Sequence, residues 1–310
     1  MHAIVQTQLL LSAFVRKTRS FKDLFDEDFR GYKKDEEIVV LCIHGFPTSN
    51  YDWSKVWEPL QRSFGRVIAT DMLGLGFSDK PRERDYTVME QADLQEDFLR
   101  YLGIKKVHIL AHDLGDTVAL EMLARYEERK SKQQDPEEDY AKIESLCLTN
   151  GGIFPETNFP KAIQKLVSNA WLGPLITRLT SYPVFARSLA SVFGPRTRPP
   201  REELQDFWTV MRHKDGYLVA PSILQYMNQR HENRGRWVDI MQTTTVPVHF
   251  IYGPADPINP PQTLDKYKEL VVKGTYTSLS EEIGHYPHWE DPDGFIAAYR
   301  HFLSKVMPEK

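Results

Sequence analysis

KVHILAHDLGDTVALEML, residues 106–123, is the stretch that decides the fold of this chain. Its first six residues predict a buried strand, and the residues from 113 onward predict a helix. At the junction, the small residues Ala111 and Gly115 flank Asp113 with a spacing of two. This spacing is typical of a turn so sharp that larger neighbours would clash, which raises the central side chain above the sheet at a helix N-terminus. We therefore predict Asp113 as a nucleophile, with a simple helix cap as the alternative.

From residue 38 onward, short apolar runs alternate with longer helical patterns, which indicates a mostly parallel α/β sheet with helices on both faces. We predict strands at 37–43, 66–70, 106–111, 146–149, 246–252 and 275–279, the last at an edge, and a helix at 88–102. The polar run 127–139 is expected to form a solvated loop.

A long block without strand rhythm separates two of these strands. Residues 155–240 are rich in Trp, Phe, Tyr and Pro and have helical patterning. We predict an inserted helical cap over the carboxyl ends of the strands, where open α/β sheets bind their ligands. The predicted parts are an N-terminal segment (1–36), a first core part (37–154), the cap (155–240) and a second core part (241–310).

The composition of the 310 residues is that of an ordinary globular protein, with 41% hydrophobic and 26% charged residues. A net charge of -4 gives no reason to expect a nucleic-acid partner. Cys42 and Cys147 lie in apolar runs and are predicted to be buried, reduced strand residues. Residues 3–15 are mostly apolar but shorter than the roughly 20 residues of a spanning helix. We expect an amphipathic docking helix there, with weak membrane association as the alternative.

Two further residues follow Asp113 in the order nucleophile, acid, histidine. Asp256 lies in a loop after a late predicted strand, and His285 lies in a loop before the final predicted helix. We predict His285 as the base and Asp256 as the residue that orients it, with ordinary loop positions as the alternative. His112 and His288 lack such support and are interpreted as structural.

The segment HGFP at 44–47 follows the first predicted core strand and supplies the expected oxyanion hole. The backbone amides of Phe46 and Leu114 are the predicted donors, and the peptide bond between Phe46 and Pro47 is a candidate cis bond. A tight turn without catalytic meaning is the alternative.

Four segments, 44–53, 71–81, 112–116 and 284–292, resemble the epoxide hydrolase and haloalkane dehalogenase branch of the α/β-hydrolases. Segments 150–157, 192–199, 224–230 and 251–260 are similar to those of the mesoderm-specific transcript family of animals. The resemblance covers roughly 37–305 and implies an α/β-hydrolase fold that needs no cofactor. The resemblance is compatible with two cellular locations, the cytoplasm and the endoplasmic reticulum membrane. The family's extra strand pair before the first glycine loop has no clear counterpart in residues 16–36.

The type of nucleophile limits the class of substrate that the protein could act on. A carboxylate that attacks an acyl carbon would form an anhydride, whereas attack on an alkyl carbon forms an ordinary ester that a histidine-activated water can hydrolyse. An epoxide or an alkyl halide is therefore the expected small apolar substrate. Dehalogenases of this fold bind the halide with side-chain N–H donors at the positions of Phe46 and Leu114, which have none, so the sequence favours an epoxide.

Epoxide hydrolases of this branch polarise the epoxide oxygen with two cap tyrosines. By resemblance, the candidate substrate-binding residues are Tyr226, Tyr182 and Trp53, with Tyr217 and Met227 as alternative positions. The leading hypothesis is a cofactor-free hydrolase that resembles an epoxide hydrolase. The alternatives are a binding or regulatory protein on the same fold, a haloalkane dehalogenase, and a lipid or ester hydrolase.

Overall fold

The computed structural model describes residues 13–17, 38–132, 140–169 and 171–307, and the description below concerns these residues. A seven-stranded sheet forms the centre, in the order β1-β3-β2-β4-β5-β6-β7, and every pair is parallel except the antiparallel β1–β3 pair. The strands are β1 (Ala13–Lys17), β2 (Val39–Ile43), β3 (Arg66–Thr70), β4 (Lys106–Ala111), β5 (Lys142–Thr149), β6 (Val248–Tyr252) and β7 (Thr275–Ser278). The predicted mostly parallel sheet with an edge strand at 275–279 is confirmed.

Helices cover both faces of this sheet, so most residues of its central strands are buried. All five residues of β2 are buried, and both cysteines are buried and free. One apolar core joins one face to α1 and α14, and another joins the opposite face to α2, α3 and α12. The helices of the two core parts are η3 (Asn50–Trp53), α1 (Trp57–Ser63), α2 (Val88–Tyr101), α3 (Leu114–Ser131), α12 (Pro261–Leu270), α13 (Pro287–Glu290) and α14 (Pro292–Val306).

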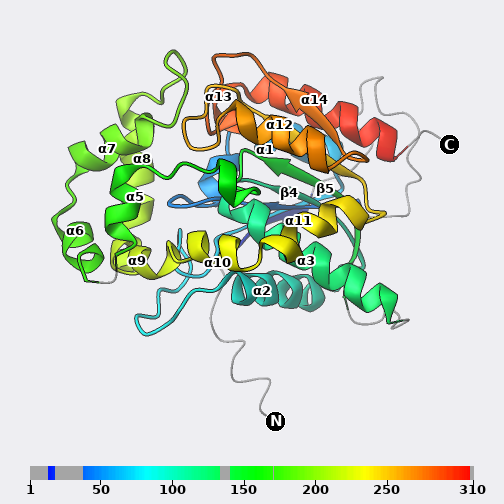
Figure 1. Cartoon of the computed structure of the whole chain (residues 1–310), viewed down its shortest axis with the longest axis horizontal. Helices are drawn as coiled ribbons and strands as arrows, with labels where there is room; N and C mark the ends of the chain where they lie inside the picture. The colour runs from blue at the N-terminus through cyan, green and yellow to red at the C-terminus, as the bar shows by residue number, and fades with distance from the viewer. Residues whose placement is uncertain (1–12, 18–37, 133–139, 170, 308–310) are drawn as a thin grey trace, which may run out of the picture.

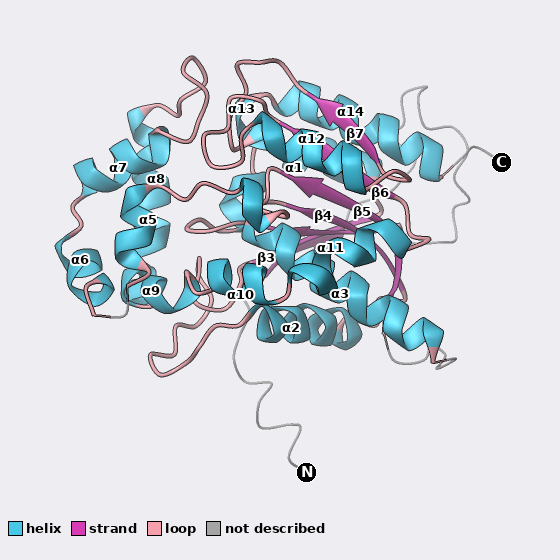
Figure 2. Ribbon diagram, in the orientation of Figure 1, coloured by secondary structure: helices cyan, strands magenta, loops and turns pink. Residues whose placement is uncertain are grey.

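Between β5 and β6 the chain is helical, as predicted for residues 155–240. Figures 1 and 2 show α5 to α9 gathered at one end of the molecule, at the left of both views. The last two helices instead approach the core, and α11 packs along α3. The helices between β5 and β6 are η4 (Pro155–Thr157), α5 (Ala162–Val167), α6 (Gly173–Leu179), α7 (Tyr182–Ala190), α8 (Arg201–Arg212), η5 (His213–Leu218), α9 (Ala220–Ile223), α10 (Tyr226–Glu232) and α11 (Arg234–Thr243).

Two local predictions differ from the structure. Residues 13–17 form strand β1 and not part of a docking helix, because they pair antiparallel with the free edge of β3. The remaining N-terminal residues of that prediction lie outside the described part. Helix α3 continues to Ser131 through the first part of the predicted loop, where Arg129 pairs with Glu96 of α2 at 2.6 Å. In the part of the chain that the structure describes, no helix has the length and apolar content needed to cross a bilayer.

Candidate active site

Asp113 lies at the turn that joins β4 to α3. Its backbone has a φ of 50° and a ψ of -108°, a conformation that non-glycine residues rarely adopt and that clusters at functional sites. A Cβ added to Gly115 would lie 2.2 Å from the carbonyl oxygen of Ile43, and one added to Gly45 would lie 2.7 Å from the Cβ of Asp113. Only glycine therefore fits at position 115 of this turn and at position 45 of the loop after β2.

The carboxylate of Asp113 does not cap α3, since its side chain makes no capping hydrogen bond. Instead, Oδ2 accepts a hydrogen bond from the backbone amide of Phe46 at 3.1 Å. The amide of Leu114 belongs to the first residue of α3, directly after the carboxylate. The peptide bond between Phe46 and Pro47 is cis. The structure thus brings the Asp113 carboxylate to the amide of Phe46 in the first glycine loop, and the other predicted donor, Leu114, directly follows Asp113 in the chain.

Arg230, on α10, is a neighbour of Asp113 that the sequence interpretation missed. Its guanidinium Nη2 lies 3.0 Å from the backbone oxygen of Asp113 and 3.5 Å from Oδ1, and its Nε donates to Thr117 at 2.8 Å. Both charged side chains are almost fully buried. Burial opposes ionisation of Asp113, but the charges of Arg230 and His285 outweigh it and lower the pKa of Asp113 below its ordinary value.

His285 and Asp256 form the predicted pair. Nδ1 of His285 lies 2.7 Å from Oδ2 of Asp256. The carboxylate also accepts hydrogen bonds from Asn150 at 2.9 Å and from the backbone of Ile258 at 2.7 Å, so its orientation is fixed. Burial disfavours the imidazolium, but the charge and hydrogen bond of Asp256, together with the charge of Asp113, raise the pKa of His285 to about 9.

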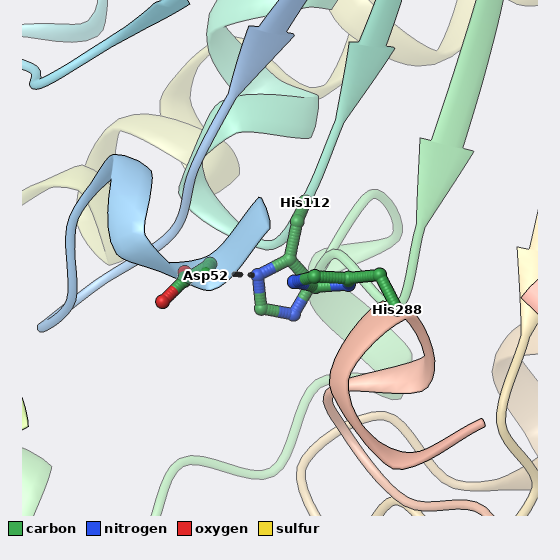
Figure 3. A group of neighbouring side chains, drawn as sticks. All are labelled: Asp52, His112 and His288. Carbon is green, nitrogen blue, oxygen red and sulfur yellow. Dashed lines mark ion pairs between the residues drawn. The ribbon is translucent and has the colours of Figure 1, made fainter. Parts of the chain in front are cut away.

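A second cluster lies behind the elbow, formed by Asp52, His112 and His288 (Figure 3). His112 donates from Nε2 to the backbone oxygen of His285 at 2.8 Å, if Nε2 carries its proton, and so links the elbow to the histidine loop. Burial lowers the pKa of His112 to about 3 and raises that of Asp52 well above its ordinary value. Burial also lowers the pKa of His288 far below its ordinary value, so both histidines are neutral at pH 7.

Among the described residues, this cluster is the group whose donor atoms could share a metal ion, since these atoms lie within 4.8 Å of one another. Nδ1 of His112, both ring nitrogens of His288 and Oδ1 of Asp52 have no hydrogen-bond partner. However, all three side chains are fully buried and none lines the pocket. The structural interpretation of both histidines therefore fits their positions.

A pocket of about 1060 Å³, counted with its open mouth, lies between the first glycine loop and the helices from α5 to α9. Phe46 and His285 line its floor, and apolar side chains such as Phe185 and Leu224 line its walls. Asp113 is only 4% exposed and is not a lining residue, so Phe46 and His285, and not its carboxylate, form the pocket floor.

Comparisons with known proteins agree with this geometry. A family model described as alpha/beta hydrolase fold matches residues 38–132. The mouse Mesoderm-specific transcript protein is 49% identical over 285 residues, which covers 91% of this chain and 83% of the mouse protein. The chain belongs to the mesoderm-specific transcript family of α/β-hydrolase-fold proteins. The family predicted from the sequence segments is thereby confirmed.

More distant relatives of this family member carry hydrolase names. LipZ of Mycobacterium tuberculosis (strain ATCC 25618 / H37Rv), named a hydrolase, is 30% identical over 261 residues, 84% of this chain and 86% of LipZ. The epoxide hydrolase CorEH superposes with a TM-score of 0.68 at 21% identity, over 87% of this chain and 92% of CorEH. The haloalkane dehalogenase DbeA of Bradyrhizobium elkani USDA94 superposes with a TM-score of 0.70 at 18% sequence identity, over 88% of this chain and 92% of DbeA. These structural likenesses show the fold, and the fold and the relatives together support a hydrolase.

The three predicted substrate-binding residues lie in different places. Tyr226 is buried beside the site, with its ring centroid 6.4 Å from that of Phe46 and the guanidinium of Arg230 4.5 Å above its ring. Tyr182 lies away from the pocket lining, and its hydroxyl donates to the backbone of Arg201 at 3.1 Å. Trp53 is fully buried behind the elbow, where it stacks on His288, and it does not line the pocket. Of the three, only Tyr226 lies close to Asp113, and it does not line the pocket, whereas the alternative candidate Tyr217 does.

Proposed function

We propose that this family member is a cofactor-free hydrolase that opens epoxides through an alkyl ester on Asp113. The observation that carries the proposal is the state of this carboxylate. It lies on the elbow, ionised, with Oδ2 held by the Phe46 amide, and His285, which is paired with Asp256, lines the pocket floor. A carboxylate in this position suits attack on an alkyl carbon and not on an acyl carbon.

In the first step, Oδ1 of Asp113 forms a bond to an epoxide carbon while the bond from that carbon to the epoxide oxygen breaks. The alkoxide that forms takes the hydroxyl proton of Tyr226. Burial raises the pKa of Tyr226 above its ordinary value, so its hydroxyl keeps a proton to donate across the whole neutral range. Arg230 balances the negative charge as it moves from the carboxylate to the oxygen.

In the second step, neutral His285 takes a proton from a water, whose oxygen attacks the ester carbon of Asp113. The negative charge that develops on Oδ2 is stabilised by the Phe46 and Leu114 amides. Collapse of this intermediate breaks the bond between the ester carbon and Oδ1, which takes one proton of the water and leaves as the new hydroxyl of the diol, while the water oxygen stays in the Asp113 carboxylate. The second water proton returns to Tyr226, so the net reaction is the addition of one water to the epoxide.

The pocket favours an epoxide over an alkyl halide. A halide leaves as a separate anion and needs its own donors, and the side chains of Phe46 and Leu114 supply none. An epoxide oxygen stays attached to the substrate and needs only one proton donor. The largely apolar lining suits an apolar epoxide, the substrate class expected from the sequence.

One observation favours a second candidate, a binding protein without turnover. Arg230 pairs with Asp113 and lowers the energy of the resting carboxylate, which makes it a weaker nucleophile. A protein that uses the pocket for reversible binding would retain the same contacts and form no ester.

Intact-protein mass spectrometry of His285→Gln, incubated with a panel of apolar epoxides, separates the two functions. Without the base, the ester forms but is not hydrolysed, so we expect the protein mass to rise by one substrate and the label to lie on the peptide with Asp113. The matched control is His301→Gln, an exposed histidine of α14, which should show no lasting adduct. If no epoxide labels His285→Gln while it still binds apolar ligands, the binding protein is the correct function.

A further inference from the structure

The helices α5 to α7 carry an unusual amount of exposed apolar surface. Seven of the eleven large hydrophobic side chains that are exposed in the described residues lie between positions 159 and 184. Trp171 is 89% exposed and Leu179 is 73% exposed. Large apolar side chains that are exposed together in one part of a domain mark a surface that docks to a partner. The seven side chains, here called the apolar patch, are Phe159, Leu166, Trp171, Leu172, Leu175, Leu179 and Val184.

Helix α6 shows that this exposure has a direction. Leu172, Leu175 and Leu179 are spaced by three and four residues, so they lie on one face of the helix. That face points outward, whereas Thr177 on the opposite face is buried and lines the pocket. An amphipathic helix that turns its apolar face away from its own core lacks its partner.

The charge around the apolar patch identifies the partner. Residues 157–201 contain no Asp or Glu but seven Lys or Arg, in a chain whose net charge is -4. Lys165, Arg178 and Arg187 are exposed on the same three helices, and no ion pair to them occurs within the described ranges. Exposed apolar side chains that include a Trp, on helices that also carry exposed cations without ion pairs among the described residues, are the composition of a surface that lies in the headgroup layer of an anionic bilayer.

The pocket joins this surface. Inner residues of α5 to α7, among them Ile163, Val167 and Leu189, line the pocket, and Val184 both lines it and is 50% exposed on the apolar patch. In Figure 1 these helices form one end of the molecule, away from the sheet. A bilayer against this end would therefore cover the pocket wall nearest to the solvent.

We propose that the outer face of α5 to α7 docks to the surface of an anionic lipid bilayer. Apolar substrate then enters the pocket from the lipid between α5 and α7. The docking surface is separate from Asp113, His285 and Asp256, and it does not depend on which reaction they perform.

Vesicle co-sedimentation of the full chain tests the surface directly, with phosphatidylcholine vesicles prepared with and without phosphatidylserine. We expect binding to the anionic vesicles that falls as salt is raised, with a blue shift of tryptophan emission that disappears in Trp171→Phe. Charge reversal in Lys165→Glu with Arg178→Glu should weaken binding at least about twenty-five-fold, since each cation near such a surface contributes about fivefold. Leu175→Ser with Leu179→Ser should reduce binding by a similar factor.

Val272→Ser with Lys273→Glu is the matched control, because both residues are exposed and lie outside the helices between β5 and β6. It should bind vesicles like the unchanged protein. Equal binding by all variants would place the contact elsewhere in the chain and overturn the proposal. So would a complete lack of vesicle binding, or a concentration-dependent dimer lost in Leu175→Ser with Leu179→Ser, which would make a second copy of the chain the partner.

Discussion

The carboxyl edge of the sheet and the helices between β5 and β6 are built on opposite principles. At the sheet edge, Asp113, Asp256 and His285 are each at most 4% exposed and held by polar contacts from neighbouring loops. The helices α5 to α7 instead expose large apolar side chains and enclose an open pocket. In the proposed function, the chemistry therefore depends on the residues of the pocket floor, whereas access and selection depend on the wall above it.

The largest expected effect concerns the floor. Asp113→Asn should abolish ester formation with every epoxide, since an amide is not a nucleophile of this kind. Asn is preferred over Ala because it tolerates the positive φ of this position and its oxygen can still accept from Phe46. The variant leaves the charge of Arg230 without a partner, so the melting temperature should fall, and circular dichroism must show that the fold is retained. Ester formation in the folded variant would remove Asp113 as the nucleophile.

The pH dependence of the two steps is the next largest effect. The pKa of Asp113 lies below its ordinary value, so ester formation should be independent of pH from about 5 upward. Hydrolysis needs neutral His285, whose raised pKa of about 9 depends in part on the charge of Asp113, and the ester removes that charge. Ester decay should therefore rise about tenfold per pH unit and level off below pH 9. Rapid-quench mass spectrometry between pH 5 and 9 measures both rates, and decay that does not change with pH would exclude His285 as the base.

The sequence located the residues at the carboxyl edge of the sheet, but it did not locate those that the helices between β5 and β6 bring to them. The difference has a physical reason. Asp113 and Phe46 belong to short local patterns at the ends of strands, His285 belongs to one in the loop after β7, and parallel strands bring such loops to one edge. Arg230 lies 117 residues from Asp113, and only the packing of α10 decides that it faces the elbow. The direction of Tyr182 and the pairing of β1 with β3 likewise depend on tertiary contacts that no local pattern contains.

Tyr226 tests whether the wall takes part in the chemistry. Tyr226→Phe removes the proposed proton donor and should slow ester formation about a hundredfold, the usual contribution of a general acid. Tyr182→Phe is the matched control, because its hydroxyl is bonded to the backbone of Arg201 away from the pocket, and it should stay within about twofold. Single-turnover rates of both variants in the His285→Gln background give the comparison. A larger loss in Tyr182→Phe would assign the donor to the wrong tyrosine.

Arg230 gives the smallest expected effect and connects the wall to the floor. It reaches from α10 to Asp113 and keeps a nearly inaccessible carboxylate ionised. Arg230→Met should therefore raise the pKa of Asp113, and ester formation at pH 5 should fall about tenfold and recover as the pH rises. Arg234→Met is the control, because Arg234 is the first residue of α11 and pairs with Glu156 at the surface. This variant should leave the pH profile of ester formation unchanged. If Arg230 only restrained the carboxylate, Arg230→Met would instead speed ester formation equally at every pH. The two outcomes differ in sign, so one pH series decides whether this arginine supports the nucleophile or restrains it.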